Sequence, residues 1–170
     1  MARRSSLRDF QENLSRRIAT ASSQERVQTK LAAESGDALW ILNLPDAGEV
    51  MPMPTLAAAP LTRHWFLGIA NIRGNLFSVI DFAGFCGKGA TQRNAATRLL
   101  LVGQRHGVNA GLVFRRVAGL RNERDLKAVG REDAAPAWQG SDYQDGDGRQ
   151  YRELDVGELM RTPEFLNVAV

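Results

Sequence analysis

Two apolar runs separated by a polar turn form the central stretch of the chain, residues 66–85. The first run ends at Ala70, and the second begins at Leu76. Apolar runs of this length on either side of an Asn- and Gly-containing turn predict two strands joined tightly. In the turn, Gly74 suits a position that requires positive φ. Arg73 is then a charged side chain displayed between two buried strands, which is typical of an internal ion pair or of a contact surface.

Most other apolar segments of the chain are also short and are bounded by turn residues. Ser35-Gly36-Asp37 separates two of them and predicts a hairpin, and Asp145-Gly146-Asp147-Gly148 predicts another. Residues 123–132 have no clear pattern, and residues 134–150 are low in hydrophobicity. The expected strands are 26–33, 38–44, 48–51, 97–102, 108–114, 115–120 and 150–154. Short strands with frequent turns indicate a mainly β, barrel-type fold rather than βαβ units.

Helical patterns are few. Residues 81–87 predict a helical turn, Asp155 caps an expected short C-terminal helix over 156–160, and 163–168 forms a last turn or tail. An apolar residue every three or four positions predicts an N-terminal helix over residues 6–21. These positions are Leu7, Phe10, Leu14 and Ile18. Packing of this helix on its own domain is favoured over docking onto a partner or a membrane surface.

We expect an N-terminal extension over residues 1–22 and a single domain over residues 23–168. The polar, Gly-rich stretch 87–96 is the expected boundary between two barrels within that domain. No apolar run approaches the roughly 20 residues of a membrane span, and no apolar segment follows the first arginines as in a secretory signal. The lone Cys86 excludes an internal disulfide and suits a reducing cytosol.

Motifs for catalysis or metal binding are missing from the sequence. His64 and His106 are isolated, and a single cysteine gives no zinc spacing. An EF-hand alignment through Gly148 places Leu154 where the bidentate glutamate belongs, so a hairpin turn is the better interpretation. The stretch around Lys88 lacks the upstream glycine and the Ser/Thr of a phosphate-binding loop. We therefore expect no enzyme, no cofactor and no metal.

The central stretch resembles the signature of CheW-like domains, in which G-[VI]-[IA]-N-[LI]-R-G is followed after a short spacer by V-I-D-[LF]. The matching residues are Gly68-Ile69-Ala70-Asn71-Ile72-Arg73-Gly74 and Val79-Ile80-Asp81-Phe82. Glu49 stands where the family carries a glutamate. Residues 110–117 resemble its G-[LI]-V-V-D-x-V segment, and residues 153–160 resemble its L-D-[IV]-x-x-L-L ending. The resemblance implies two SH3-like, five-stranded β-barrel lobes, with the N-terminal helix as an addition.

The chain departs from the family pattern at two further positions. Arg115 replaces an aspartate of the second-barrel segment, and Ser78 stands where many members have proline. With the additional N-terminal helix, the combination resembles the CheW-type adaptors of type IV pilus twitching motility more than flagellar ones.

The resemblance implies a non-enzymatic adaptor that couples a methyl-accepting chemoreceptor-like protein to the regulatory domain of a CheA-like histidine kinase. It implies that Glu49 and Arg73 face each other. The expected partner-binding residues are Glu49, Val50, Gly68, Asn71, Arg73, Gly74 and Phe77. The protein is expected in the cytoplasm, recruited to membrane-associated receptor arrays, without inserting into the membrane and without binding nucleic acid.

Two alternatives use the same fold. A small β-barrel with net charge +3 and a pI near 9.5 could bind nucleic acid, although its arginines are scattered along the chain. Steep salt dependence of DNA or RNA binding would identify such a protein. A free-standing kinase regulatory domain has the same fold, and no catalytic motif distinguishes it from an adaptor.

Overall fold

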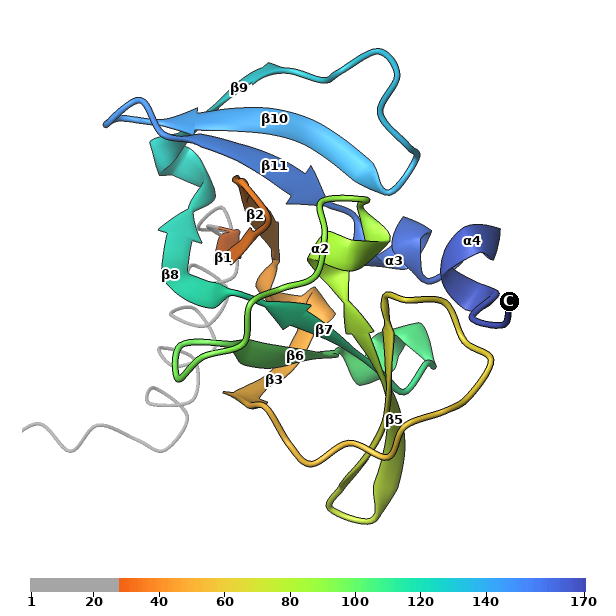
Figure 1. Ribbon diagram of the computed structural model, residues 1–170. Helices are drawn as coiled ribbons and strands as arrows, with labels where there is room; N and C mark the ends of the chain where they lie inside the picture. Colours follow the sequence, from red (N-terminus) through yellow and green to blue (C-terminus); the bar gives the residue numbers. More distant parts are fainter. Residues whose placement is uncertain (1–27) are drawn as a thin grey trace, which may run out of the picture.

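The computed structural model describes residues 28–170, which form two β-sheets, three short α-helices and three 3-10 helices (Figure 1). The helix predicted over residues 6–21 lies outside the described residues. The predicted mainly β fold is confirmed, because the described chain folds into one six-stranded and one five-stranded sheet.

The six-stranded sheet combines the start of the described chain with its end. Its strands are β1 (Thr29–Ser35), β2 (Ala38–Asn43), β8 (Arg116–Asn122), β9 (Leu126–Gly130), β10 (Gln139–Asp145) and β11 (Gln150–Leu154), in the order β8-β1-β2-β11-β10-β9. The predicted hairpin around Gly36 joins β1 to β2. Strands β2 and β11 pair in parallel, while the other pairs are antiparallel. The segment without a clear sequence pattern contains β9.

The five-stranded sheet carries the central stretch of the sequence. Its strands are β3 (Ala47–Pro52), β4 (Phe66–Ile72), β5 (Asn75–Asp81), β6 (Arg98–Val102) and β7 (Ala110–Phe114), in the order β3-β6-β7-β5-β4. The predicted pair of strands around Arg73 is the β4–β5 hairpin. Alternate residues of β4 are buried, as expected for a strand with one face on the core.

The predicted boundary at residues 87–96 does not separate the two sheets. Strands β1 and β2 precede this loop but pair with β8 and β11, which follow it. Strands β6 and β7 follow the loop but pair with β3 and β5, which precede it. The physical reason is pairing between distant segments, since β-strands find partners through backbone hydrogen bonds that leave no mark in local composition.

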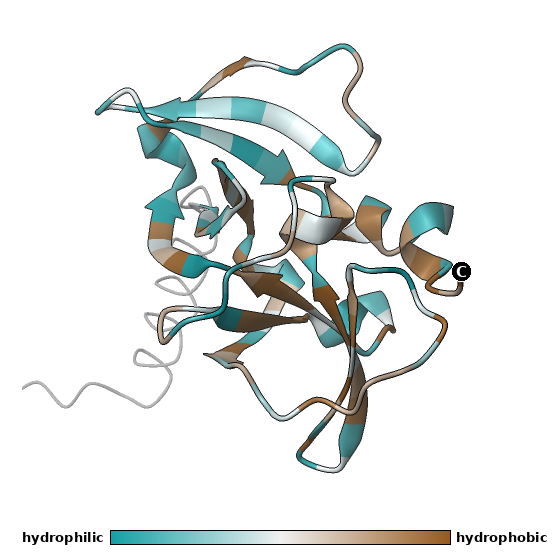
Figure 2. Ribbon diagram, viewed as in Figure 1, coloured by the Kyte–Doolittle hydropathy of each residue, from teal (hydrophilic) through white to brown (hydrophobic). Residues whose placement is uncertain are grey.

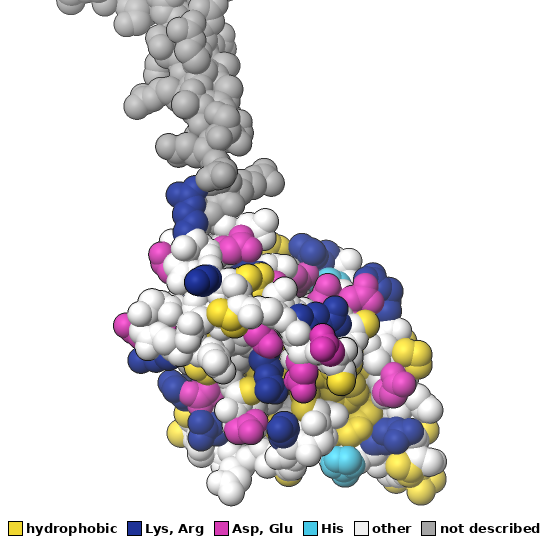
Figure 3. Space-filling model, turned by 90° about the horizontal axis from the view of Figure 1, so that it is seen from above, with side chains coloured by type: hydrophobic (Ala, Val, Ile, Leu, Met, Phe, Trp, Pro, Cys, Tyr) yellow, Lys and Arg dark blue, Asp and Glu magenta, His cyan; other side chains and the backbone are white. Residues whose placement is uncertain are grey.

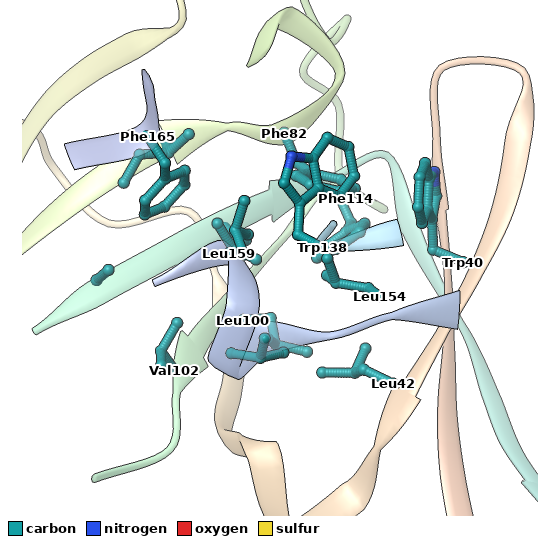
Figure 4. Packing of buried hydrophobic residues seen from close by; sticks show 14 of the residues in the cluster. Trp40, Leu42, Phe82, Leu100, Val102, Phe114, Trp138, Leu154, Leu159 and Phe165 are labelled. Carbon is teal, nitrogen blue, oxygen red and sulfur yellow. The ribbon is translucent and has the colours of Figure 1, made fainter. Parts of the chain in front are cut away.

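The core cluster that joins the two sheets combines aromatic and aliphatic side chains (Figure 4). The ring of Phe82 contacts Trp40 edge-on at a centroid distance of 5.0 Å, and it also contacts Phe114 and Trp138. Phe165 belongs to the same core, although it comes from the last helix. These rings tie residues from both sheets and the C-terminal segment into one apolar cluster.

Side-chain caps hold the short helices α2 and α3. Helix α2 (Phe82–Phe85) starts at Asp81, whose carboxylate accepts a hydrogen bond from the amide of Gly84 at 3.3 Å. The same carboxylate accepts hydrogen bonds from the amide and the hydroxyl of Thr91, so it also anchors the loop that follows α2. Asp155 caps α3 (Val156–Leu159) as predicted, and α4 (Pro163–Leu166) lies in the expected last turn.

The β10–β11 hairpin is the most hydrophilic part of the six-stranded sheet (Figure 2). Its turn is built on Asp145, whose carboxylate accepts hydrogen bonds from the amides of Asp147 and Arg149. The hydroxyl of the buried Tyr151 donates to the same carboxylate at 2.8 Å. The turn therefore uses the acidic side chain for its own backbone, as the hairpin interpretation predicts.

Arg115, which stands where the family pattern has an aspartate, pairs with an acidic side chain of the adjacent strand. Arg115 and Arg116 both form ion pairs with Glu34 of β1, one guanidinium on each carboxylate oxygen. The Glu34 side chain is only 10% exposed, and the hydrogen bond from Arg116 is the main cause that lowers its pKa. An arginine is therefore accommodated here by a carboxylate that the adjacent strand supplies.

Candidate functional site

The turn between β4 and β5 displays Arg73 at the tip of the hairpin. Arg73 and Gly74 both have positive φ, 52° and 84°, as in the two-residue turns whose twist matches antiparallel strands. The side-chain oxygen of Asn71 accepts a hydrogen bond from the amide of Gly74 at 2.9 Å. Asn71 and Gly74 thus shape the turn, while the Arg73 side chain stays 76% exposed.

Arg73 reaches the opposite edge of its sheet. Its Nη2 lies 2.8 Å from Oε1 of Glu49 in β3, so the ion pair implied by the resemblance is confirmed. Because β3 and β4 are the two edge strands, the contact between β3 and the β4–β5 turn requires the sheet to curl. The pair therefore spans the open side of the curled sheet.

A groove of about 540 Å³ lies beside this ion pair. Segments from β3, the β4–β5 hairpin, the end of β6 and the turn before β7 converge on it. Its charged and apolar lining includes Glu49, Ile72, Arg73, Phe77, Leu101 and Val108. A groove lined by apolar side chains and by one acidic and one basic group is a surface suited to a partner side chain or a helix.

The turn before β7 is held in place by Asp46, which sequence reasoning did not single out. Asp46 is 5% exposed, and its Oδ1 accepts from His106 Nε2 at 2.7 Å and from Arg105 Nη2 at 3.0 Å. Its carbonyl oxygen also accepts from the amide of Gly103 at 2.8 Å. The residues are about sixty positions apart in sequence, so no local motif links them. His106 therefore helps to hold this turn against Asp46.

The sequence-predicted site residues fall into separate places. Glu49, Arg73 and Phe77 line the groove, whereas Val50 lies outside its lining at 39% exposure on the edge strand β3. Gly68 is buried, with a φ of 126°, and a side chain there would collide with the carbonyl oxygen of Ala57. Gly68 lets the 53–65 connection cross β4 closely, so it supports the lobe without offering a contact surface.

Stability alone does not account for arginine at position 73. An exposed ion pair contributes about 0–1 kcal/mol, and a side chain at positive φ costs about 1–2 kcal/mol. Glycine or asparagine would suit this turn position better. Strain kept at an exposed, charged position is an observation that points to function.

Within residues 28–170, no cluster of three or more His, Cys, Asp or Glu side chains could hold a metal ion. Across the same described range, none of the helices combines the length and hydropathy needed to cross a membrane. The groove presents one ion pair and several apolar side chains.

A family model described as CheW-like domain matches residues 31–164. The chain belongs to the CheW-like domain family. Members of this family are scaffold proteins rather than enzymes. The family signature around Arg73 coincides with the hairpin tip and the groove described above.

The chain is also similar to one curated protein and to one solved structure. The chain is 30% identical to Protein PilI of Pseudomonas aeruginosa over 111 residues, which cover 63% of this chain and 62% of PilI. The crystal structure of the scaffolding protein TtCheW from Thermoanaerobacter tengcongensis superposes with a TM-score of 0.62 at 20% identity. That match covers 75% of this chain and 88% of TtCheW, and it shows that the CheW-like fold of two SH3-like lobes is shared.

Basic and acidic side chains alternate on the face seen in Figure 3. Lys and Arg do not gather there into one continuous patch, and Asp or Glu side chains lie between them. Nucleic-acid binding relies on clustered cations along one face. This face therefore lacks the charge pattern that the nucleic-acid alternative requires.

Proposed function

We propose that this protein is a chemosensory adaptor that couples a chemoreceptor-like protein to a CheA-like histidine kinase. Membership of the CheW-like family and the similarity to PilI support the proposal. The observation that carries it is Arg73, held at positive φ and 76% exposed beside an apolar groove. A side chain in this setting adds little to stability and is placed to meet a partner.

The groove beside Arg73 is the proposed site for the receptor-like protein. Glu49 and Arg73 supply one charge of each sign at the rim, and Phe77 supplies an apolar surface. A receptor segment with a basic and an acidic residue flanking an apolar one would exchange the Glu49–Arg73 pair for intermolecular pairs. Glu49 and Arg73 are 38% and 76% exposed in the side chain, so this exchange requires little desolvation.

Strand β3 is the proposed site for the regulatory domain of the kinase. It is an edge strand of the five-stranded sheet, and Val50 is exposed on it. Edge strands carry backbone groups that a partner strand can pair with, and exposed apolar side chains beside them add contact area. The two proposed surfaces adjoin at Glu49, which would allow both partners to be held by one lobe.

The proposal is tested by calorimetric titration of the protein with the kinase regulatory domain and with the cytoplasmic tip of the receptor from the same cell. Arg73→Glu is compared with Arg161→Glu. Arg161 is a matched control, because it is also an exposed arginine in an ion pair, with Glu158 at 2.6 Å. Circular dichroism and melting curves are recorded for all three proteins.

The expected result is binding of both partners by the wild type, with receptor binding weakened at least about thirty-fold in Arg73→Glu and unchanged in Arg161→Glu. The mutant should remain folded. Failure of the folded wild type to bind either partner in moderate salt would refute the adaptor proposal. Equal losses in both variants would show that net charge, and not the groove, controls binding.

The similarity to PilI supports a role in type IV pilus twitching motility, with the protein in the cytoplasm and recruited to receptor arrays at the membrane. Deletion of the gene should abolish twitching zones on agar. Complementation with wild type should restore them, while Arg73→Glu should not. Restoration of twitching by Arg73→Glu would show that motility does not depend on the groove beside Arg73.

A further inference from the structure

Three exposed apolar side chains lie where residues 166–170 meet the segment before β4. They are Leu61, Leu166 and Val170, which are 81%, 54% and 81% exposed. The amide of Val170 donates a hydrogen bond to the carbonyl oxygen of Leu61 at 3.1 Å. The Nε of Arg63 donates to the carbonyl oxygen of Asn167, the residue after Leu166, at 3.0 Å. These bonds bring the three side chains together, and we call them the C-terminal patch.

Leu61 has a backbone conformation that stability does not favour. Its φ is 57°, in the left-handed region that a leucine rarely adopts. The segment is nevertheless held in place, because Thr62 and Ala169 form an antiparallel bridge. The amide of Arg63 also donates to the carbonyl oxygen of Val168 at 2.9 Å. A strained backbone that displays an apolar side chain to solvent points to a contact surface.

A groove of about 540 Å³ lies beside the C-terminal patch. Much of its lining is apolar, and Pro136, Ala137 and Pro163 in that lining are exposed. The groove shares no residue with the groove beside Arg73. This surface therefore combines projecting apolar side chains with an apolar hollow.

The same groove carries one exposed charge of each sign. Arg63 and Glu164 both line it, and each lies two residues from a leucine of the C-terminal patch. Within residues 28–170, neither side chain forms an ion pair. One surface thus holds a cation and an anion that both lack a partner of opposite charge in the described part of the molecule.

We propose that this surface pairs with the same surface of a second copy of the chain, in a two-fold symmetric dimer. In such a contact, the same patch on both protomers is used reciprocally. Arg63 would pair with Glu164 of the partner subunit, and Glu164 would pair with Arg63 of the partner subunit. The leucines of each C-terminal patch would enter the opposite groove, which removes their apolar surface from water.

Charge complementarity favours a second copy over a lipid surface. Anionic headgroups would attract Arg63 but repel Glu164, whereas a second copy satisfies both charges at once. The apolar part is also self-complementary, because it offers both leucines that project and a groove that can receive them. The surface is small, so we expect a weak dimer with a Kd of roughly 10–100 µM.

Pairing through this surface would leave the groove beside Arg73 available, since the two grooves share no lining residue. A dimer would therefore present two copies of that groove. Two linked sites bind two linked partner segments more tightly than one site does. This consequence rests on the proposed adaptor function, but the pairing itself does not.

Sedimentation equilibrium of the full chain measures the pairing at concentrations from about 5 to about 500 µM. Arg63→Glu and Glu164→Arg should each weaken association at least about ten-fold, because each places like charges opposite one another. The double variant exchanges the two charges and restores both pairs, so it should associate within about three-fold of the wild type.

Arg93→Glu is the matched control for the change in net charge. Arg93 is an exposed arginine outside the lining of the groove. This variant should associate like the wild type.

Leu61→Gly tests the apolar part of the contact. Glycine adopts positive φ without strain, so the melting temperature of the dilute monomer should not fall. Association should nevertheless weaken at least about ten-fold, because the leucine side chain no longer enters the opposite groove. A stable monomer with weaker pairing separates a contact role of Leu61 from a role in the fold.

Several results would overturn the proposal. These are a wild type that stays monomeric over the whole range, a double variant that does not recover, or an equal loss in Arg93→Glu. Association of Leu61→Gly at the wild-type level would also overturn it. A monomeric chain that sediments with vesicles of phosphatidylcholine and phosphatidylglycerol would assign the C-terminal patch to a membrane surface instead.

Discussion

Replacing Glu34 with glutamine tests how the six-stranded sheet tolerates two adjacent arginines. Glu34 lies on β1, and its two carboxylate oxygens pair with Arg115 and Arg116. Glutamine keeps the shape of the side chain but removes the charge. One oxygen can still accept a hydrogen bond, whereas the amide group would face the second guanidinium with its own donors.

The size of the effect follows from burial. The Glu34 side chain is 10% exposed, while Arg115 and Arg116 are 56% and 55% exposed. Hydrogen bonds to charged groups contribute about 1.5–3 kcal/mol each, but water screens the two exposed guanidiniums and reduces this contribution. We therefore expect a loss of about 2 kcal/mol in the free energy of unfolding. For a chain of this size, that loss lowers the melting temperature by about 4–8 °C.

The effect should depend on pH in one direction. The hydrogen bond from Arg116 is the main cause that lowers the pKa of Glu34 in the folded protein below its ordinary value of 4.5. A carboxylate with a lowered folded pKa stabilises the protein fully above its unfolded pKa, and this stabilisation is lost as pH falls through the folded pKa. The difference between wild type and Glu34→Gln should be constant above about pH 5 and should shrink below pH 4.5.

The assay is urea unfolding followed by circular dichroism at pH 7, 5, 4 and 3, on wild type, Glu34→Gln and Glu164→Gln. Glu164 is an exposed glutamate on α4 and controls for the loss of one negative charge. The control should lie close to wild type at every pH. A difference between wild type and Glu34→Gln below about 0.5 kcal/mol at pH 7, or a large one that persists unchanged at pH 3, would refute the reasoning.

Three further substitutions have defined outcomes in melting curves. Arg73→Gly should change the melting temperature by less than about 4 °C. Relief of the positive-φ strain offsets the loss of the ion pair with Glu49. A larger drop would show that Arg73 is needed for stability. Gly68→Ala should destabilise the protein by more than about 3 kcal/mol, because the new methyl group meets the carbonyl oxygen of Ala57, and wild-type stability would disprove that close approach. Asp81→Ala should lower the free energy of unfolding by about 2–3 kcal/mol, because the carboxylate caps α2 and binds Thr91. It should also make the loop after α2 more sensitive to limited proteolysis. Unchanged cleavage would show that the bonds to Thr91 do not hold this loop.

Local chemistry in the sequence predicted the elements well. The turn at Arg73 and Gly74, the hairpin at Gly36 and the cap at Asp155 are all present. Each depends on residues within a few positions of one another, because turn dihedrals and caps are set by short-range sterics and hydrogen bonds. The pairing of Glu49 with Arg73 came from the family signature and not from local chemistry.

Contacts between segments that are far apart in the sequence could not be predicted from local chemistry. Asp46 pairs with Arg105 and His106. Glu34 pairs with Arg115 and Arg116. No local sequence pattern near either acidic residue predicts these partners. The division of the two barrels at 87–96 stays a prediction, and composition marks this loop without showing which strands pair across it. Gly68 was taken as a contact residue because it lies in the signature, and the structure places it in the interior.

The sequence by itself determined the family, the mainly β character and the position of the exposed arginine, because these depend on local patterns of apolar, turn and charged residues. Only the tertiary structure decided how the strands divide between two sheets and which side chains form the groove. It alone also brought Arg63 and Glu164 to one groove. The physical reason is that backbone pairing and apolar packing act between surfaces that meet only after the chain has folded.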